Sequence, residues 1–377
     1  MSPEFWYCSQ AFLIAFFALA FYSRSYHIDL YPLLMIAAWL MGVCAIYLIY
    51  GDSQVEFYSN DQLIHQEIIN VVIPNSQNIF NEFIGFRYLL TLPAYVFSKI
   101  GFNEMLIIKA FQLFSLLGIY TTSRNVINKC GFRLHIWHFL FIASPVFFFF
   151  SLLSLRDVIL AYFTIRVVFD DHRERRLFLL VLIFLLKPHL AASLFFGWVL
   201  VGSIQRKSFR LKVFISSVFV VISYLLGSLT YSLGSFVQNG FFPGLPNQAL
   251  TQMSLTRLAL NFSGLQFLPL ISEEKGIVAS SLSQLLLTRL LFVDTFLIPV
   301  LFLLIALFAC KQLSHEAKLI GSSFFFYLGI VLQTDFNSTR QNLPFLAAMG
   351  IIVVVNIEYS KAIRQKSAID DLPTEAF

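Results

Sequence analysis

Long apolar runs, separated by short polar or basic segments, make up most of this chain. A helix needs roughly 20 mostly apolar residues to cross the hydrocarbon core of a bilayer, and somewhat fewer where it is short or broken. Backbone polar groups find no partner in lipid, so such runs form helices. The pattern therefore predicts an all-α bundle with membrane-crossing helices over residues 5–22, 30–50, 104–121, 136–153, 156–169, 213–229, 284–309, 319–334 and 343–357.

Two further apolar stretches are interrupted. The stretch 177–202 is too long for a single crossing, and Lys187-Pro-His189 lies within it. Because proline breaks a helix, we expect two short helices that meet at a polar apex. The segment 84–98 contains Arg87 and Pro93, and its composition fits a crossing helix, a re-entrant piece or a surface helix.

The short basic loops predict the orientation of the chain, because Lys and Arg are enriched in loops on the cytoplasmic side. Placing all of them in the cytoplasm gives about 11 crossings, an external N-terminus and a segment 84–98 that does not cross. Residues 1–377 then form a single membrane domain with external loops at 51–83 and 230–283 and a cytoplasmic tail at 358–377. The basic loops lie at 124–133, 173–176, 206–212, 311–318 and 361–366.

Composition agrees with this class of protein. The chain is 58% hydrophobic and 12% charged, whereas a soluble domain carries about a quarter of its residues as charges. The formal charge of +5 is too small to indicate nucleic-acid binding. The first apolar stretch lacks a basic leader and a small-residue cleavage site, so we interpret it as a crossing helix and not as a cleaved signal peptide.

Motifs for common cofactors are missing from the sequence. The four cysteines have neither C-x-x-C nor C-x-x-H spacing, and we interpret them as packing residues. The sequence also contains no Walker loop, G-x-G-x-x-G or H-E-x-x-H motif. We therefore expect no cofactor and no metal ion.

Five polar interruptions fall on the predicted outer face. Ionisable groups beside membrane helices usually face a cavity or a functional site, since they are costly in lipid. We therefore expect a single polar cavity that opens to the periplasm. The interruptions are Asn60-Asp61 with His65, Ser154-Leu-Arg156-Asp157, Lys187-Pro-His189, Arg257, and the segment from Asp335 to Asn342 with Arg340.

Cations in these interruptions are candidates for binding phosphate. Arg156 precedes a helix whose N-terminus favours anions, and Arg340 could grip phosphate oxygens with its planar guanidinium. Lys187 could act as a point charge and His189 as a hydrogen-bonding or proton-relay group. The alternatives are a local Arg156–Asp157 pair, interfacial anchoring and a snorkelling lysine. Arg257, in a long loop, is the weakest candidate.

The predicted external loop 51–83 has no Lys or Arg and contains several carboxylates. Asn60, Asp61 and His65 combine a carboxylate with hydrogen-bonding groups suited to sugar hydroxyls. A carboxylate that faces cations can deprotonate an acceptor hydroxyl while a phosphate leaves. Asp61 is therefore the candidate general base, and Asp157 is the rival.

This pattern resembles the Wzy-type O-antigen and capsular polysaccharide polymerases, within the GT-C-like polytopic glycosyltransferases. The resemblance rests on the architecture and on placed polar residues, and it covers nearly the whole chain. The residues that carry it are Asp61, the Ala-Ser-Pro145 segment followed by Arg156 and Asp157, Lys187 with His189, and Arg340. The chain departs from the archetypal GT-C pattern because it has Asn60-Asp61 where an acidic pair is expected.

The resemblance implies glycosyl transfer from a polyprenyl-(pyro)phosphate-linked donor at the periplasmic face of the bacterial inner membrane. It implies undecaprenyl-linked oligosaccharide substrates, membrane lipids and a chain-length regulator as partners. Asp61, Arg156 and Asp157 would be catalytic, while Asn60, His65, Lys187, His189, Arg257 and Arg340 would bind substrate. Polymerisation of repeat units is favoured over transfer of one sugar from a polyprenyl monophosphate. A transporter is the alternative from another class, and it would show inverted repeats and charges at mid-membrane depth.

Overall fold

The computed structural model describes the chain in several stretches, and all of the regular secondary structure within them is helical. The described residues are 2–25, 30–50, 65–75, 88–135, 137–138, 142–143, 145–203, 214–215, 218, 312–331 and 338–370. Their helices are α1 (Pro3–Ser25), α2 (Leu30–Tyr50), the π-helix η2 (Ile68–Val72), α4 (Ile73–Asn75), α5 (Tyr88–Ser98), α6 (Glu104–Lys129), α8 (Pro145–Ser151), α9 (Asp157–Phe169), α10 (Arg173–Leu186), α11 (Pro188–Ser203), α17 (Ser314–Val331) and α18 (Ser338–Asp370).

The longest central helix, α6, begins and ends at recognisable signals. The side chain of Asn103 accepts a hydrogen bond from the Leu106 backbone N–H at 3.0 Å, which satisfies one of the free donors of the first turn. At the other end Gly131 has a φ of +84°, a left-handed conformation that glycine adopts without steric cost. These signals fix the ends of a 26-residue helix.

A break at Lys187 divides α10 from α11, as the sequence predicts. Lys187 has φ −159° and ψ 85°, outside the helical region. The residue before a proline is disfavoured in the helical conformation because the proline ring clashes with its backbone. Pro188 then begins α11, where its missing N–H costs nothing. The expected pair of short helices with a polar apex is confirmed.

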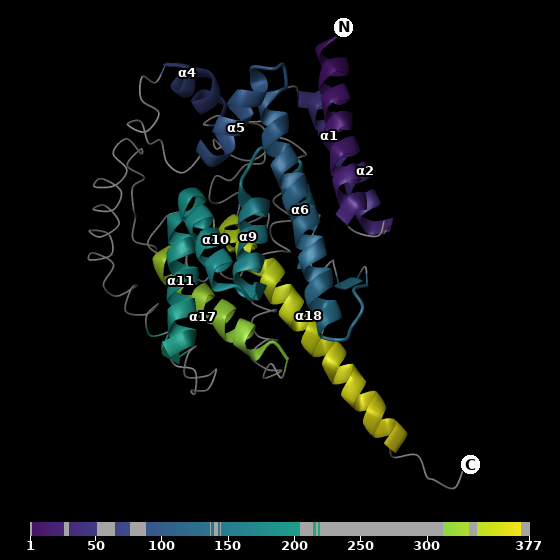
Figure 1. The fold of residues 1–377 in the computed structure, drawn as a ribbon, viewed down its shortest axis with the longest axis vertical. Helices are drawn as coiled ribbons and strands as arrows, with labels where there is room; N and C mark the ends of the chain where they lie inside the picture. The colour runs from purple at the N-terminus through teal and green to yellow at the C-terminus, as the bar shows by residue number, and fades with distance from the viewer. Residues whose placement is uncertain are drawn as a thin grey trace, which may run out of the picture.

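Helix α6 occupies the middle of the bundle. It lies between the α1–α2 pair (purple) and the group formed by α9, α10 and α11 (teal) (Figure 1). Helix α9 packs against α6, α10 and α18, and α11 packs along α17. The last turns of α18 project beyond the other helices, at the opposite end of the molecule from the start of α1 (Figure 1).

Four helices among the described residues are long and apolar enough to cross a membrane: Pro3–Arg24, Leu30–Ile49, Glu104–Lys129 and Leu343–Gln365. Two of them, from α6 and α18, are mostly buried in the bundle, whereas fewer than half of the residues of α1 and α2 are buried. Phe12, Phe16 and Phe21 on α1 are each more than half exposed. Apolar side chains on the outside and buried helices inside are the arrangement expected of a bundle in lipid.

Contacts between helix ends sort into two groups at opposite ends of the bundle. At one end, the first turn of α6 and the residues before it meet three other segments, through Gln10–Asn103, Asn70–Glu104 and Ser154–Met105. At the other end, the last residue of α6 meets the α9–α10 loop, and the middle of α18 meets residues near α8 and α17, through Lys129–Asp171, His138–Glu358 and Asn356–Gln312.

The structure adds detail to three segments of the sequence predictions. Residues 65–75 of the predicted external loop 51–83 are helical, with Ile68 and Ile69 buried. The segment 84–98 contains α5, whose 11 residues are too few to cross a bilayer by themselves. The predicted tail 358–377 continues α18 as far as Asp370. The predicted crossings 213–229 and 284–309 lie almost wholly outside the described residues.

Candidate functional site

The candidate site forms where two interruptions of the helices meet. Helix α10 ends at Leu186, and the carbonyls of a last helical turn have no partner within their own helix. Arg156, the residue that precedes α9, donates a hydrogen bond from Nη1 to the Leu186 carbonyl oxygen at 2.6 Å. This bond joins the segment 154–157 to the α10–α11 break.

Asp157 is the first residue of α9 and is almost completely buried, with 3% of its surface exposed. A carboxylate in the first turn interacts favourably with the positive end of the helix dipole. Burial of a charge is otherwise costly, so the helix end and the nearby cations stabilise it there. The Asp157 carboxylate also acts electrostatically on Tyr327.

Lys187 and His189 converge on the ring of Tyr327 from the start of α11. Lys187 is 6% exposed, and its Nζ lies 5.5 Å from the centroid of the Tyr327 ring, within the range of a cation–π interaction. The His189 ring is stacked against the same ring at 5.6 Å, with 30° between the planes. Both Arg156 and Lys187 are close enough to act electrostatically on His189. Within the described part of the chain, His189 Nε2 is buried without a hydrogen-bond partner.

Tyr327 is the site residue that sequence reasoning missed. It lies on α17, is completely buried, and packs at 5.1 Å against the ring of Phe345 on α18. The sequence does contain a signal for this residue. Tyr327 follows the phenylalanine run Phe324 to Phe326, and it places a hydroxyl at the end of that apolar run.

His65 connects the segment after Asp61 to this cluster. It is 1% exposed, and its Nδ1 lies 2.8 Å from the Ser154 carbonyl oxygen. A carbonyl oxygen only accepts, so Nδ1 carries the proton and donates, which makes Nε2 the acceptor in the neutral ring. Asp61 precedes His65 by four residues in the sequence.

The structure therefore brings together five of the nine predicted site residues: His65, Arg156, Asp157, Lys187 and His189. Asn60, Asp61 and Arg257 lie outside the described residues. Arg340 lies in the first turn of α18, and the description does not extend to its side chain. Over the described stretches, no group of three or more His, Cys, Asp and Glu side chains could hold a metal ion.

The arrangement can hold an anion, because two cations and a helix N-terminus meet in a largely buried place. It also has a buried carboxylate and an imidazole nitrogen that could move a proton.

Comparison with known proteins does not assign the chain to a family. No family model, curated protein or solved structure matches the chain. The fold and the apolar helices define the class: an all-helical protein with several helices suited to crossing a membrane.

Proposed function

We propose that the protein is a glycosyltransferase that takes sugars from a polyprenyl-(pyro)phosphate-linked donor at the periplasmic face of the bacterial inner membrane. Polymerisation of repeat units of O-antigen, capsule or exopolysaccharide is the reaction that the sequence pattern favours. The substrates are then undecaprenyl-linked oligosaccharides. The full proposal includes the 11 crossings and the outward-facing polar cavity.

The observation that carries the proposal is the meeting of Arg156 and Lys187 at one end of a bundle of apolar helices. When a glycosidic bond to a lipid pyrophosphate breaks, negative charge develops on the departing phosphate. Cations fixed in a site shielded from water stabilise that charge more than they would in water. The N-terminus of α9, beside Arg156, adds backbone N–H groups that favour the same anion.

The second chemical requirement is a base for the acceptor hydroxyl. Asp61 and Asp157 are the two carboxylates considered, and Asp157 is buried beside the cations. His189 offers a buried ring nitrogen that could bind the acceptor hydroxyl or relay its proton. Substituting each of these groups in turn would show which one acts as the base.

Substitution of Arg156 tests the proposal most directly. Arg156→Ala should reduce transfer from a radiolabelled undecaprenyl-pyrophosphate-linked oligosaccharide by about a hundredfold or more, the loss typical of removing one group that stabilises transition-state charge. Arg156→Lys should recover part of the rate, since it restores the charge without the planar fork.

Arg175→Ala is the matched control, because Arg175 is exposed near the far end of α10. It should transfer at the wild-type rate. Wild-type polymer from correctly inserted Arg156→Ala protein would refute the proposal.

A further inference from the structure

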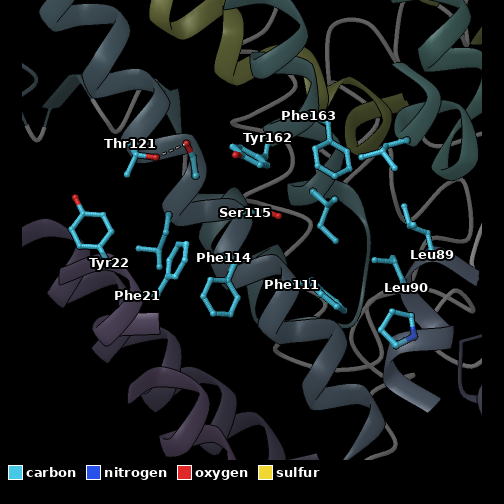
Figure 2. Close-up of a pocket in the computed structure, with 15 residues that line it drawn as sticks. Phe21, Tyr22, Leu89, Leu90, Phe111, Phe114, Ser115, Thr121, Tyr162 and Phe163 are labelled. Atoms are coloured by element: carbon cyan, nitrogen blue, oxygen red, sulfur yellow. Dashed lines mark hydrogen bonds between the residues drawn. The ribbon is translucent and has the colours of Figure 1, made fainter. Parts of the chain in front are cut away.

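A pocket of about 660 Å³ is lined by residues of α1, α5, α6, α9 and α10. Figure 2 shows side chains from α1, α5, α6 and α9 around it, with Phe114 beside Phe21 of α1. The lining is mainly aromatic and aliphatic, and its volume is in the range of pockets that hold small molecules.

The pocket lies at the depth of the lipid chains. Its α6 residues run from Phe111 to Thr121, in the middle of a helix suited to crossing a membrane. These residues span about 15 Å along the helix axis, or half of the hydrocarbon core. Phe21 is 67% exposed and Phe114 is 38% exposed, and their rings pack edge to face at 6.4 Å. The pocket therefore opens at the outer surface between α1 and α6, where lipid would contact the protein.

Two lining residues connect the pocket to the segments that carry the cations. Ile159, which lines it, follows Asp157 by two residues, about 3 Å along the axis of α9. Leu182 lines the pocket from α10. It lies one helical turn before Leu186, whose carbonyl oxygen accepts the hydrogen bond from Arg156. An anionic head at Arg156 and Lys187 would thus leave its apolar chain at the start of the pocket.

We propose that this pocket holds the hydrocarbon chain of a polyprenyl phosphate whose head binds at Arg156 and Lys187. This inference rests on the proposed function and identifies where the lipid part of its substrate binds. A polyprenyl phosphate suits this arrangement because its single chain is attached directly to its phosphate. A glycerophospholipid instead places a glycerol between its phosphate and two chains.

Photocrosslinking tests the occupant. Phe114 is replaced by p-benzoylphenylalanine in the full-length protein in lipid nanodiscs, and the probe is a radiolabelled eleven-isoprene phosphate. The same replacement at Phe16, which is 57% exposed on α1 and does not line the pocket, is the matched control. Capture of the probe at Phe114 and not at Phe16, with competition by unlabelled probe but not by excess phosphatidylglycerol, is the expected result.

Equal capture of phosphatidylglycerol at Phe114 would overturn the inference, as would a crosslink from Phe114 to another segment of this chain. Neither result depends on catalysis. If the probe is captured at Phe114 while Arg156→Ala transfers sugar normally, the proposed function fails and the lipid site remains. If transfer behaves as proposed and Phe114 captures phosphatidylglycerol as well as the probe, the pocket inference alone fails.

Gly118 provides a second test of the same pocket. A Cβ at Gly118 would lie 2.5 Å from Cε2 of Tyr162, and both residues line the pocket. Gly118→Ala therefore forces the Tyr162 ring to move, and we expect about a tenfold weaker half-saturation by the eleven-isoprene phosphate. A two-isoprene phosphate should be unaffected, because Gly118 lies about 20 Å along α6 from Met105 at the level of Ser154. An equal loss of affinity for both chain lengths would overturn the inference.

Discussion

The rings of His189 and Tyr327 are stacked 5.6 Å apart, although one begins α11 and the other lies deep in α17. Lys187 approaches the same tyrosine ring at 5.5 Å. Tyr327 thus holds in place the two polar residues that flank the proline break. The polar apex of the α10–α11 pair owes its geometry to a helix from the other end of the sequence.

Two substitutions of Tyr327 should distinguish the contribution of its ring from that of its hydroxyl. Tyr327→Phe keeps the stacking and the cation–π contact, so we expect near wild-type transfer and thermal stability. Tyr327→Leu removes the aromatic face that holds Lys187 and His189, and it should reduce transfer strongly and cost about 1–3 kcal/mol of stability. Transfer rates and thermal unfolding of both variants in detergent check this. Normal transfer by Tyr327→Leu would show that the ring does not position the site.

The close packing of α11 on α17 leads to a second prediction. A Cβ at Gly197 would lie 2.0 Å from Ser323 Oγ and about 3 Å from backbone atoms of Ser323, which cannot move aside. Gly197→Ala should therefore separate the helices and lower stability by about 1–3 kcal/mol, as overpacking does. Because these helices carry His189 and Tyr327, transfer should fall as well.

Gly42→Ala is the matched comparison for Gly197→Ala. Its Cβ would meet the end of the Leu152 side chain at 2.8 Å, and a side-chain end can rotate away. Thermal unfolding should therefore show the smaller loss at Gly42. An equal loss at both positions would contradict the backbone contact as the cause.

Acid stability should depend on Asp170, at the end of α9 away from the candidate site. Burial raises the pKa of this carboxyl, but a hydrogen bond from the His172 N–H and the charge of Arg166 outweigh burial, so the pKa lies below its ordinary value. A lowered pKa adds stability that is complete above the ordinary value of about 4 and is lost as the pH falls through the lower, folded-state pKa.

Asp170→Asn should therefore lower the unfolding temperature at pH 7 and reduce its decline in acid. Asp171→Asn is the control, because Asp171 is exposed and its pair with Lys129 is exposed too, and exposed pairs contribute little. Unfolding temperatures of both variants and the wild type, measured from neutral to acid pH, test whether the Asp170 carboxylate contributes this stability. Parallel curves for Asp170→Asn and the wild type would exclude a role for this carboxylate.

Membrane orientation can be measured with single cysteines at exposed positions, after replacement of Cys8, Cys44, Cys130 and Cys310. Asn70 lies at the end of the bundle that carries the site, whereas Asn128 and Glu174 lie at the opposite end. Asn70→Cys should react with an impermeant maleimide from the periplasm, and Asn128→Cys and Glu174→Cys should react only after lysis. The reverse labelling would place the candidate site in the cytoplasm and contradict the outward-facing site.

The sequence predicts the helix break at Lys187 and the clustering of Arg156, Lys187 and His189 because both depend on local signals. Proline ends a helix wherever it occurs in the middle of an apolar run, and basic loops report which ends of the helices lie together. Lateral packing has no such signal. Tyr327 stands out from its phenylalanine neighbours only once α17 is known to face α11. Gly197 marks the face of α11 that packs on α17, but this is visible only from how closely it approaches Ser323.

The apolar pocket likewise depends on which faces of the helices meet. Its lining comes from α1, α5, α6, α9 and α10, and each contributing residue looks like ordinary packing in the sequence. The helix at 65–75 in the predicted loop 51–83 escaped prediction because it is short and polar at several positions. Its burial comes from tertiary contacts such as His65 with Ser154.

The identity of the general base is the last prediction. Asp61 lies outside the described residues, whereas Asp157 is the first residue of α9, next to Arg156. If Asp61 is the base, Asp61→Asn should bind the lipid-linked donor normally and fail to transfer, because an amide cannot accept the proton. Asp61→Glu should keep part of the rate, since the carboxylate remains. Asp157→Asn should keep partial activity if Asp157 only orients Arg156, and donor binding measured beside transfer rates distinguishes the roles. Should Asp61→Asn transfer at the wild-type rate and Asp157→Asn be inactive, Asp157 is the base, and Asp61 either binds sugar or serves the fold.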